Sequence, residues 1–248
     1  MANFPPLKKH LLYCIDRMTE SHPVSGPFLD AGCGSGDVSL HLARKNWTGR
    51  AIDMSEDAVE NALSLMAAHP SVRVENESLF EQTGKFNAVF AMDVIEHLDN
   101  DVAALEKIAS LLPPGGHLIL SVPSNPREWR WDDDVFGHVR RYTAGELSEK
   151  LNNAGFSPVE MWDFTFPVFW LMRRAYTRLK PKPTDGIEKS SMERTIKSSG
   201  LNPWEIPVLS GLLSRENPFW RFVSRWQFRH FRHRLDNGHE IILLARKN

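Results

Sequence analysis

The sequence has only two cysteines, Cys14 and Cys33, among its 248 residues. Two thiols are too few for a disulfide framework, and their spacing is unlike the paired cysteines of a zinc site. This scarcity favours a reducing compartment, so we expect a cytoplasmic protein.

Long hydrophobic runs are absent as well. The longest apolar stretches, near residues 164–172 and 208–213, are far shorter than the roughly 20 residues that a membrane-spanning helix needs. The first twenty residues contain one short apolar run and no small-residue cleavage site, which argues against a signal peptide. We therefore expect a chain that does not span a bilayer.

Neither sign of charge dominates. Thirty Lys and Arg oppose thirty-one Asp and Glu, giving a formal net charge of -1. This balance argues against a uniformly basic nucleic-acid-binding protein and against an acidic disordered chain. It is an average over two unlike parts, because residues 164–235 carry a formal charge of +9 and the remainder carries -10.

From residue 28 onward, short apolar runs alternate regularly with amphipathic runs. The apolar runs predict strands over 27–32, 50–54, 72–76, 86–94, 117–123, 156–164 and 239–247. The amphipathic runs predict helices over 37–45, 56–69, 101–112 and 144–154. Strands separated by helices at this spacing pair through right-handed crossovers. We therefore predict an α/β fold: a Rossmann-like, doubly wound, mostly parallel seven-stranded sheet with helices on both faces.

Residues 164–235 differ from this pattern and are interpreted as a basic, aromatic-rich insertion or cap before the last strand. Residues 1–163 together with 236–248 then form the α/β domain. The end of the insertion interleaves Phe and Trp with five arginines, which favours a helix. Such a helix could pack its aromatic side chains on the domain, contact an anionic membrane surface or an apolar acceptor, or bind RNA.

A glycine-rich segment, DAGCGSG, follows the first predicted strand. Open α/β sheets bind ligands at the carboxyl ends of strands where the strand order reverses, and glycines there permit a tight turn. The glycines of this segment recur in steps of two and lack the third glycine of the dinucleotide fingerprint, which disfavours a nicotinamide cofactor. No Gly-Lys-Ser/Thr is present, so the phosphate cradle of nucleotide triphosphatases is missing.

Asp53 ends the second predicted strand, where a carboxylate can accept both hydroxyls of a ribose. Together with the acidic Asp30 at the glycine segment, this indicates a nucleoside that has no phosphate and a positive or amine-bearing tail. S-adenosylmethionine is such a molecule.

Four motifs over residues 28–163 occur in register: DAGCGSG, AIDMS, FNAVFAMDVIEHL and LLPPGGHLILSVP. With them the chain resembles class I S-adenosylmethionine-dependent methyltransferases, and its EHL is similar to that of small-molecule and quinone-precursor O-methyltransferases. The resemblance implies S-adenosyl-L-methionine as cofactor and S-adenosyl-L-homocysteine as product. The cofactor contacts that it implies are Asp30, Gly32, Gly34, Gly36, Ile52, Asp53, Met54, Glu77, Ser78, Leu79, Met92 and Asp93.

Methyl transfer from a sulfonium is an in-line displacement in which the protein mainly aligns the acceptor. A histidine is the natural general base for a hydroxyl acceptor near neutral pH. We predict His138 in this role, with Tyr142 nearby as a further catalytic residue and His97 as the other candidate. The alternatives are that His97 packs or caps a helix and that residues 138–143 form a solvated helix entry.

The acidic run Asp132–Asp134 offers carboxylate oxygens, the ligands that Mg²⁺ prefers. Three adjacent carboxylates cannot all face one ion without distorting the backbone. We therefore predict no metal site.

The expected function is methyl transfer to a small or lipid-like acceptor, with oxygen favoured as the acceptor atom. One alternative is an RNA methyltransferase that grips its substrate with the basic insertion, and another is a non-catalytic cofactor-binding protein. Nucleic-acid bases are disfavoured, because the chain lacks the Asn/Asp-Pro-Pro-aromatic run of amino-methylating enzymes and the Pro-Cys pair that attacks cytosine. Peripheral membrane contact through residues 164–235 is compatible with this function. The sequence does not indicate an oligomeric state.

Overall fold

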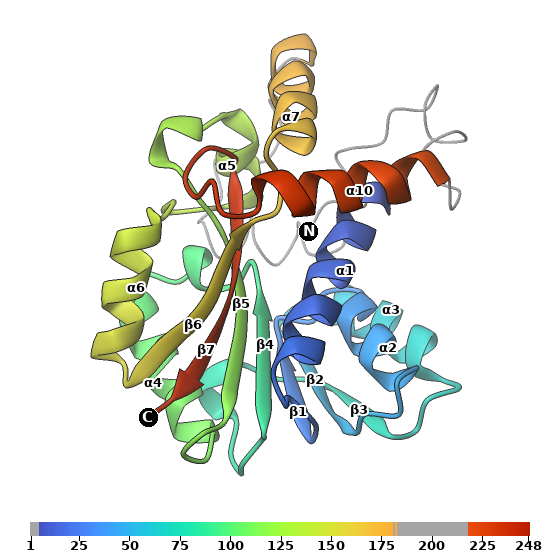
Figure 1. The fold of residues 1–248 in the computed structure, drawn as a ribbon. Coiled ribbons are helices and arrows are strands. Elements are labelled where there is room, and N and C mark those ends of the chain that lie inside the picture. Colours follow the sequence, from blue (N-terminus) through green and yellow to red (C-terminus); the bar gives the residue numbers. More distant parts are fainter. Residues whose placement is uncertain (1–4, 181, 183–217) are drawn as a thin grey trace.

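The computed structural model describes residues 5–180, 182 and 218–248. In this part of the chain, seven strands form one sheet in the order β3-β2-β1-β4-β5-β7-β6 (Figure 1). The strands are β1 (Phe28–Ala31), β2 (Gly49–Asp53), β3 (Val72–Asn76), β4 (Ala88–Met92), β5 (His117–Pro123), β6 (Phe156–Asp163) and β7 (Glu240–Lys247). The strands β1 to β5 pair in parallel. The predicted fold class is confirmed.

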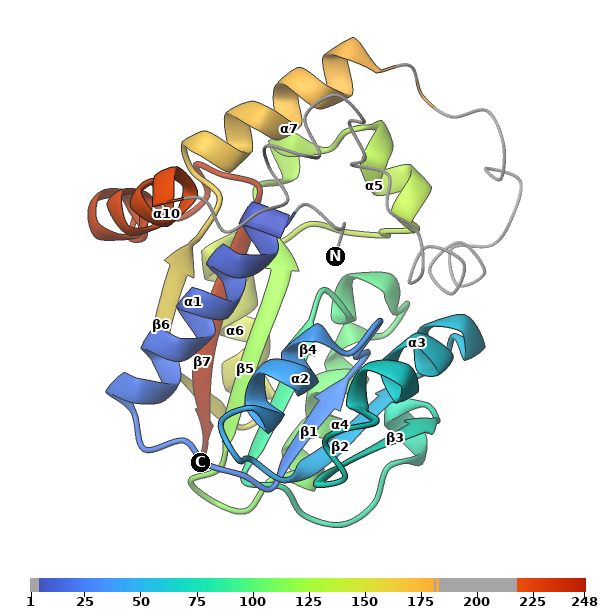
Figure 2. The same ribbon diagram turned by 90° about the vertical axis from the view of Figure 1, so that its right-hand side faces the viewer.

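Helices cover both faces of this sheet (Figure 2). The α-helices are α1 (Pro5–Ser21), α2 (Asp37–Ala43), α3 (Glu56–Met66), α4 (Asp101–Leu111), α5 (Trp131–Phe136), α6 (Ala144–Asn153), α7 (Val168–Leu179) and α10 (Pro218–Phe231). Short 3₁₀ helices are η1 (Leu79–Glu81), η2 (Ile95–His97) and η3 (Pro126–Glu128).

Two hydrophobic cores flank the sheet, because successive side chains of a strand point to opposite faces. In β1, Phe28 belongs to the core shared with α1, α2 and α3. The next residue, Leu29, belongs to the core shared with α4 and α6. Both faces are therefore apolar, as expected for a sheet of parallel strands covered by helices on each side.

The last strand lies inside the sheet. β7 runs antiparallel between β5 and β6, with Ile242 opposite Ser121 on one side and Trp162 on the other. The sequence predicted the strand but not this position, because pairing with strands far away in the chain has no local signal.

Helix α1 was absent from the sequence prediction. Its buried residues Leu11, Cys14, Ile15 and Met18 recur at helical spacing and pack in the core beside α2 and α3. This periodicity was available in the sequence and predicts an amphipathic helix.

Helices α7 and α10 lie between β6 and β7 in the chain. The structure describes residues 164–180, 182 and 218–235 of the predicted insertion, and the division into an α/β domain and an insertion stays a prediction. In Figure 2, α5 and α7 lie beyond the carboxyl ends of the parallel strands. Among the described residues, no helix is both long enough and apolar enough to cross a membrane.

Candidate active site

The chain leaves β1 through a tight glycine bend, residues 32–36, before α2 begins. Gly32, Gly34 and Gly36 have φ angles of 72°, 52° and 83°, a region that strains residues with a side chain. A Cβ on Gly32 would also lie 2.6 Å from the Cγ2 atom of Val94. Glycine is therefore required at position 32 both by the backbone angle and by the close approach of the chain after β4.

Asp53 at the end of β2 holds this bend in place. Its Oδ2 atom accepts a hydrogen bond from the Gly34 N–H, and its Oδ1 atom accepts one from the Ser55 N–H, both at 2.9 Å. The side chain is largely buried. Each carboxylate oxygen has about two acceptor sites, so each can still accept one hydroxyl proton after binding the backbone.

Asp30 lies beneath the bend on β1 and is almost completely buried. Its carboxylate accepts a hydrogen bond of 2.6 Å from the Ser39 hydroxyl on α2. Burial raises the pKa of Asp30 to about 7, although the hydrogen bond from Ser39 opposes this shift. The hydrogen bond from Ser39 to Asp30 joins β1 to α2, the two elements on either side of the bend.

Residues beside Asp53 and beyond β3 were predicted to contact the adenine. Ile52 is buried in the sheet, whereas the Met54 side chain is 47% exposed. Glu77 follows β3, and its carboxylate accepts a hydrogen bond of 2.6 Å from the Gln82 amide. Parallel strands end at the same edge, so these residues share the edge that carries the glycine bend.

Four more predicted residues occupy the ends of β3 and β4. Ser78 caps the 3₁₀ helix η1 by accepting a hydrogen bond from a backbone N–H, and Leu79 is buried. Met92 ends β4 and is largely buried. The next residue, Asp93, has a positive φ of 55° and accepts a hydrogen bond of 2.8 Å from the Ser121 hydroxyl. A strained aspartate at a strand end of this kind is a candidate functional residue.

The structure brings the two predicted histidines together. His97 ends η2 and His138 follows α5, yet their ring centroids are 4.9 Å apart. Glu96 lies beside both, with its Oε1 atom 3.8 Å from His97 Nε2 and 4.0 Å from His138 Nε2. Sequence reasoning missed Glu96 as a site residue, although it forms part of the EHL motif.

Burial dominates the electrostatics of this cluster. Glu96 is fully buried, and within the described residues neither carboxylate oxygen has a hydrogen-bond partner. Burial and the negative charges of Asp93 and Glu240 raise the pKa of Glu96 well above its usual range. Burial and the neighbouring His138 lower the pKa of His97 to about 3, so this ring is neutral at pH 7. Two imidazoles and a carboxylate can move protons or bind a metal ion.

Tyr142 occupies a different environment. Its ring is fully buried in the core that includes α4 and α6, and its hydroxyl donates a hydrogen bond of 2.8 Å to Asp101. Burial raises the pKa of the hydroxyl above its usual range. The catalytic role of Tyr142 stays a prediction, and this position gives it no support.

The acidic run at the start of α5 forms buried ion pairs. Arg173 of α7 donates to Asp132 at 2.6 and 2.7 Å and to Asp133 at 2.9 Å. Asp133 also accepts hydrogen bonds from Arg141 at 2.9 Å and from His138 Nδ1 at 2.8 Å. Burial would raise the pKa of Asp133, but the bond from His138 and the two arginine charges outweigh it and hold the pKa far below its usual range. Arginines thus occupy two of the three carboxylates of this run, those of Asp132 and Asp133.

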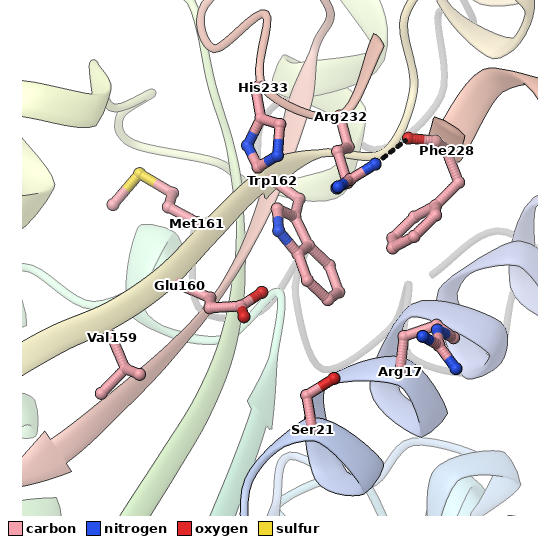
Figure 3. A pocket seen from close by; sticks show the side chains of 9 residues that line it. All are labelled: Arg17, Ser21, Val159, Glu160, Met161, Trp162, Phe228, Arg232 and His233. Carbon is pink, nitrogen blue, oxygen red and sulfur yellow. Dashed lines mark hydrogen bonds between the residues drawn. The ribbon is translucent and has the colours of Figure 1, made fainter. Parts of the chain in front are cut away.

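A surface pocket between α1, β6 and the end of α10 lies apart from these residues (Figure 3). Arg17 and Trp162 line it, together with Arg232, whose guanidinium lies 4.8 Å from the centroid of the Phe228 ring. None of the predicted site residues lines this pocket. It has no part in the candidate active site.

The strand order reverses between β1 and β4, and the glycine bend and Asp53 lie at that edge. These features define an open, Rossmann-like α/β protein. Residues 8–161 match the methyltransferase domain family. Because this match covers more than half of the chain, the chain belongs to the methyltransferase domain family, and the resemblance seen in the sequence is confirmed.

The curated relatives include ubiquinone biosynthesis O-methyltransferases. The one from Xanthomonas axonopodis pv. citri (strain 306) is 36% identical over 105 residues, which are 40% of this chain and 44% of that protein. The one from Xylella fastidiosa (strain 9a5c) is 32% identical over 114 residues, 43% of this chain and 46% of that protein. The chain thus spans less than half the length of these curated relatives.

Solved structures share the fold. The 1,6-didemethyltoxoflavin-N1-methyltransferase of Burkholderia thailandensis has a TM-score of 0.58 at 16% identity, covering 99% of this chain and 80% of that chain. The [4+2]-cyclase SpnF has a TM-score of 0.57 at 20% identity, covering 95% and 81%. At these identities the likeness establishes the fold alone.

Proposed function

We propose that this protein is an S-adenosylmethionine-dependent methyltransferase that methylates a small or lipid-like acceptor at oxygen. The observation that carries the proposal is the glycine bend held by Asp53 at the edge where the strand order reverses. A carboxylate there suits the ribose of a nucleoside cofactor. The relatives named ubiquinone biosynthesis O-methyltransferase support oxygen as the acceptor atom and a quinone precursor as a model acceptor.

In this function the glycine bend runs beneath the methionine part of the cofactor. Asp53 accepts the ribose hydroxyls with the lone pairs that its two backbone hydrogen bonds leave. Ile52 and Met54 flank the adenine, and Glu77, Ser78 and Leu79 lie beyond it. Asp30 on β1 accepts a hydrogen bond from Ser39 on α2 and so joins the two elements on either side of the bend.

The acceptor lies beyond Met92 and Asp93, next to His97 and His138. The cofactor supplies the methyl group and the leaving group. The protein aligns the acceptor oxygen with the methyl carbon, and alignment of this kind lowers a barrier by roughly 7 to 11 kcal/mol. His138 is oriented by its hydrogen bond to Asp133, so its Nε2 atom is placed to take the hydroxyl proton.

The exposed face of α10 supports a lipid-like acceptor. Val223, Ser224 and Gln227 are buried on one side of the helix. Phe219, Phe222 and Trp226 are 59%, 66% and 38% exposed. A shallow hollow on this side is lined by Pro218, Arg221, Phe222, Arg225, Trp226, Arg229 and His230. Aromatic and arginine side chains on one helix face are typical of contact with an anionic membrane surface, so we include peripheral membrane contact in the proposal.

The decisive experiment offers the protein a lipid and metabolite extract with S-adenosylmethionine labelled in its methyl group, followed by fractionation by polarity. We expect label in an apolar or small-molecule fraction. Label in the RNA fraction would instead select the RNA methyltransferase. Cofactor binding without transfer to any fraction would favour a non-catalytic protein, an outcome to be measured directly because this fold also occurs in a protein named as a cyclase.

A further inference from the structure

The surface pocket of Figure 3 is built by three elements that are far apart in the chain. Helix α1 contributes Arg17 and Ser21, β6 contributes residues 159–162, and the end of α10 with the turn after it contributes Phe228 and Arg232. The pocket has a volume of about 460 Å³, within the range of roughly 300 to 1,000 Å³ of small-molecule sites. It is therefore large enough to hold a small organic molecule.

Aromatic side chains form the apolar wall of this pocket. Trp162 is 4% exposed, and its ring meets that of Phe228 edge-on, with 4.8 Å between the ring centroids. Figure 3 shows the Trp162 ring in the middle of the lining residues. Because the two rings hold each other in place, an apolar part of a ligand meets a wall that is already ordered, which lowers the entropy cost of binding.

Arg232 is held in position beside this wall. Its guanidinium lies 4.8 Å from the centroid of the Phe228 ring, and its Nη1 atom donates to the carbonyl oxygens of Phe228 and Arg229 at 3.2 and 3.3 Å. Within the described residues, its Nε and Nη2 atoms have no acceptor and no carboxylate pairs with it. A guanidinium fixed in this way keeps its remaining N–H donors for a ligand.

Further donors line the same space. Arg17 uses its Nη1 atom for an exposed pair with Glu20 at 3.2 Å. In the part of the chain that the structure describes, the indole N–H of Trp162 has no acceptor. His233 adds an imidazole to the lining. The pocket therefore offers N–H groups that the protein itself does not use.

One carboxylate, that of Glu160, also lines the pocket, and its Oε1 atom lies 3.2 Å from Nε2 of His22. Two guanidinium groups thus line the pocket against one carboxylate that is already in contact with a histidine, so the balance of charge favours an anion. The arginine fork matches the oxygen atoms of a phosphate or a carboxylate. A phosphate ester has three terminal oxygens, one for each of the donors Arg17, Arg232 and Trp162, whereas a carboxylate has two.

We propose that this pocket binds the phosphate group of an organic phosphate ester, with the apolar part of the ester against Trp162 and Phe228. The same group occurs on soluble esters and on phospholipid headgroups, and the pocket adjoins the end of α10, the helix that carries the proposed membrane contact. The proposal does not rest on the proposed function, because none of the predicted site residues lines the pocket.

The test is a ligand-observed NMR titration with phenyl phosphate, with and without S-adenosyl-L-homocysteine. We expect one phenyl phosphate per chain, which S-adenosyl-L-homocysteine does not displace. Phenol has the same ring without the phosphate and should bind at least about 10-fold more weakly, because it lacks the charge-assisted hydrogen bonds. A folded chain that binds no phenyl phosphate, or that binds phenol equally well, overturns the proposal. Binding of benzyltrimethylammonium in its place also overturns it, because Glu160 and the rings would then select a cation.

Arg232→Met should weaken the binding of phenyl phosphate about 10-fold or more. Arg17→Met should weaken it several-fold, a smaller effect because the Arg17 side chain is 46% exposed. The matched control is Arg234→Met, which removes an arginine that lies 5.5 Å from the Phe231 ring centroid and does not line the pocket. This control should bind like the wild type. Thermal unfolding checks that each variant folds, and unchanged affinity in a folded Arg232→Met or Arg17→Met variant overturns the proposal.

Vesicles of phosphatidylcholine with phosphatidic acid identify the source of the phosphate group. If it belongs to a lipid headgroup, phenyl phosphate should release the protein from these vesicles, and they should retain Arg232→Met less than Arg234→Met. If phenyl phosphate has no effect and both variants are retained equally, the ester is a soluble molecule. Both results support the pocket.

The titration separates this proposal from the proposed function. Protein that binds phenyl phosphate but no S-adenosyl-L-homocysteine supports the pocket and contradicts the proposed function. Protein that binds S-adenosyl-L-homocysteine but no phenyl phosphate overturns the pocket and leaves the proposed function intact.

Discussion

At the scale of single residues, Asp53 combines observed structural hydrogen bonds with the proposed binding of the ribose. Its two carboxylate oxygens bind backbone N–H groups on either side of it, in the glycine bend and at the start of α3. The proposed ribose contact uses the acceptor capacity that remains. A substitution would therefore remove the proposed ribose contact together with the hydrogen bond that holds the bend.

Asp53→Ala should weaken S-adenosylmethionine binding by more than about 1 kcal/mol, because it removes hydrogen bonds to a charged acceptor. Isothermal titration calorimetry measures the change directly. Asp57→Ala, which removes an exposed carboxylate from α3, is the control and should bind like the wild type. An unaltered affinity in a folded Asp53→Ala variant would remove Asp53 from the site.

His10 on α1 predicts a pH-dependent stability. Burial lowers the pKa of His10 from 6.5 to about 3. Between these two pH values the imidazole is protonated in the unfolded chain and neutral in the folded chain. The contribution of His10 to the free energy of unfolding is therefore fully present above pH 6.5, and it is lost as the pH drops toward 3. Between pH 7 and pH 5 this residue should lower the free energy of unfolding of the wild type by about 2 kcal/mol.

His10→Leu should remove this part of the pH dependence, since Leu fills a similar volume without titrating. Urea unfolding at pH 7 and pH 5 gives the two free energies of unfolding. His230→Leu, at an exposed position of α10, should keep the wild-type dependence. If the free energy of unfolding falls equally from pH 7 to pH 5 in His10→Leu and in the wild type, His10 is protonated in the folded protein.

At the scale of elements, α7 is docked on α5 by charge. Arg173 lies 4% exposed and bridges Asp132 and Asp133, while its guanidinium also donates to the Glu128 carbonyl. The same carboxylate of Asp133 orients His138. The position of α7 is thus linked to the candidate active site through one ion cluster.

Arg173→Met should destabilise the protein by about 3 kcal/mol or more, because it leaves the buried carboxylate of Asp132 without the arginine that pairs with it. Denaturant unfolding measures this change. Arg178→Met, on an exposed position of the same helix, should change stability by less than about 0.5 kcal/mol. Similar values for the two variants would show that the cluster contributes no more than a surface pair.

Helix α10 carries the proposed membrane contact. Sedimentation with anionic vesicles should retain the wild-type chain, and neutral vesicles should retain less of it, because basic residues contribute on the order of 1 kcal/mol each at an anionic surface. Phe222→Ser should reduce retention several-fold. Phe80→Ser, which removes a 48% exposed phenylalanine from η1, should not, and equal retention of both variants would contradict the assignment to α10.

At the scale of the whole molecule, the proposed cofactor site depends on the packing of both faces of the sheet. The bend, Asp30 and Asp53 come from neighbouring strands whose side chains enter both cores. A ligand bound there should stabilise the folded chain as a unit, because unfolding destroys the site.

S-adenosyl-L-homocysteine at 100 times its dissociation constant should add about 2.7 kcal/mol to the free energy of unfolding. For a protein of this size, that corresponds to a rise in Tm of roughly 5 to 10 °C. Differential scanning fluorimetry measures the shift. NADH is the control and should give none, because the glycine spacing disfavours a dinucleotide, and a shift with NADH alone would contradict the cofactor assignment.

The sequence by itself determined the strands of the sheet, the glycine bend and the acid at the end of β2. These features depend on neighbours in the chain: alternation of side chains along a strand, helical periodicity and the backbone freedom of glycine. The helix α1 was predictable on the same grounds. Motifs in register then indicated the family, which the match over residues 8–161 confirms.

Only the tertiary structure decided which distant groups meet. β7 enters between β5 and β6, Arg173 reaches Asp132 and Asp133, and Glu96 joins His97 and His138. Such contacts arise from the packing of whole elements, and nothing in the spacing of the residues along the chain specifies them. The same burial that removes water from Glu96 also decides the charge on the group, which is a property of its surroundings in the fold.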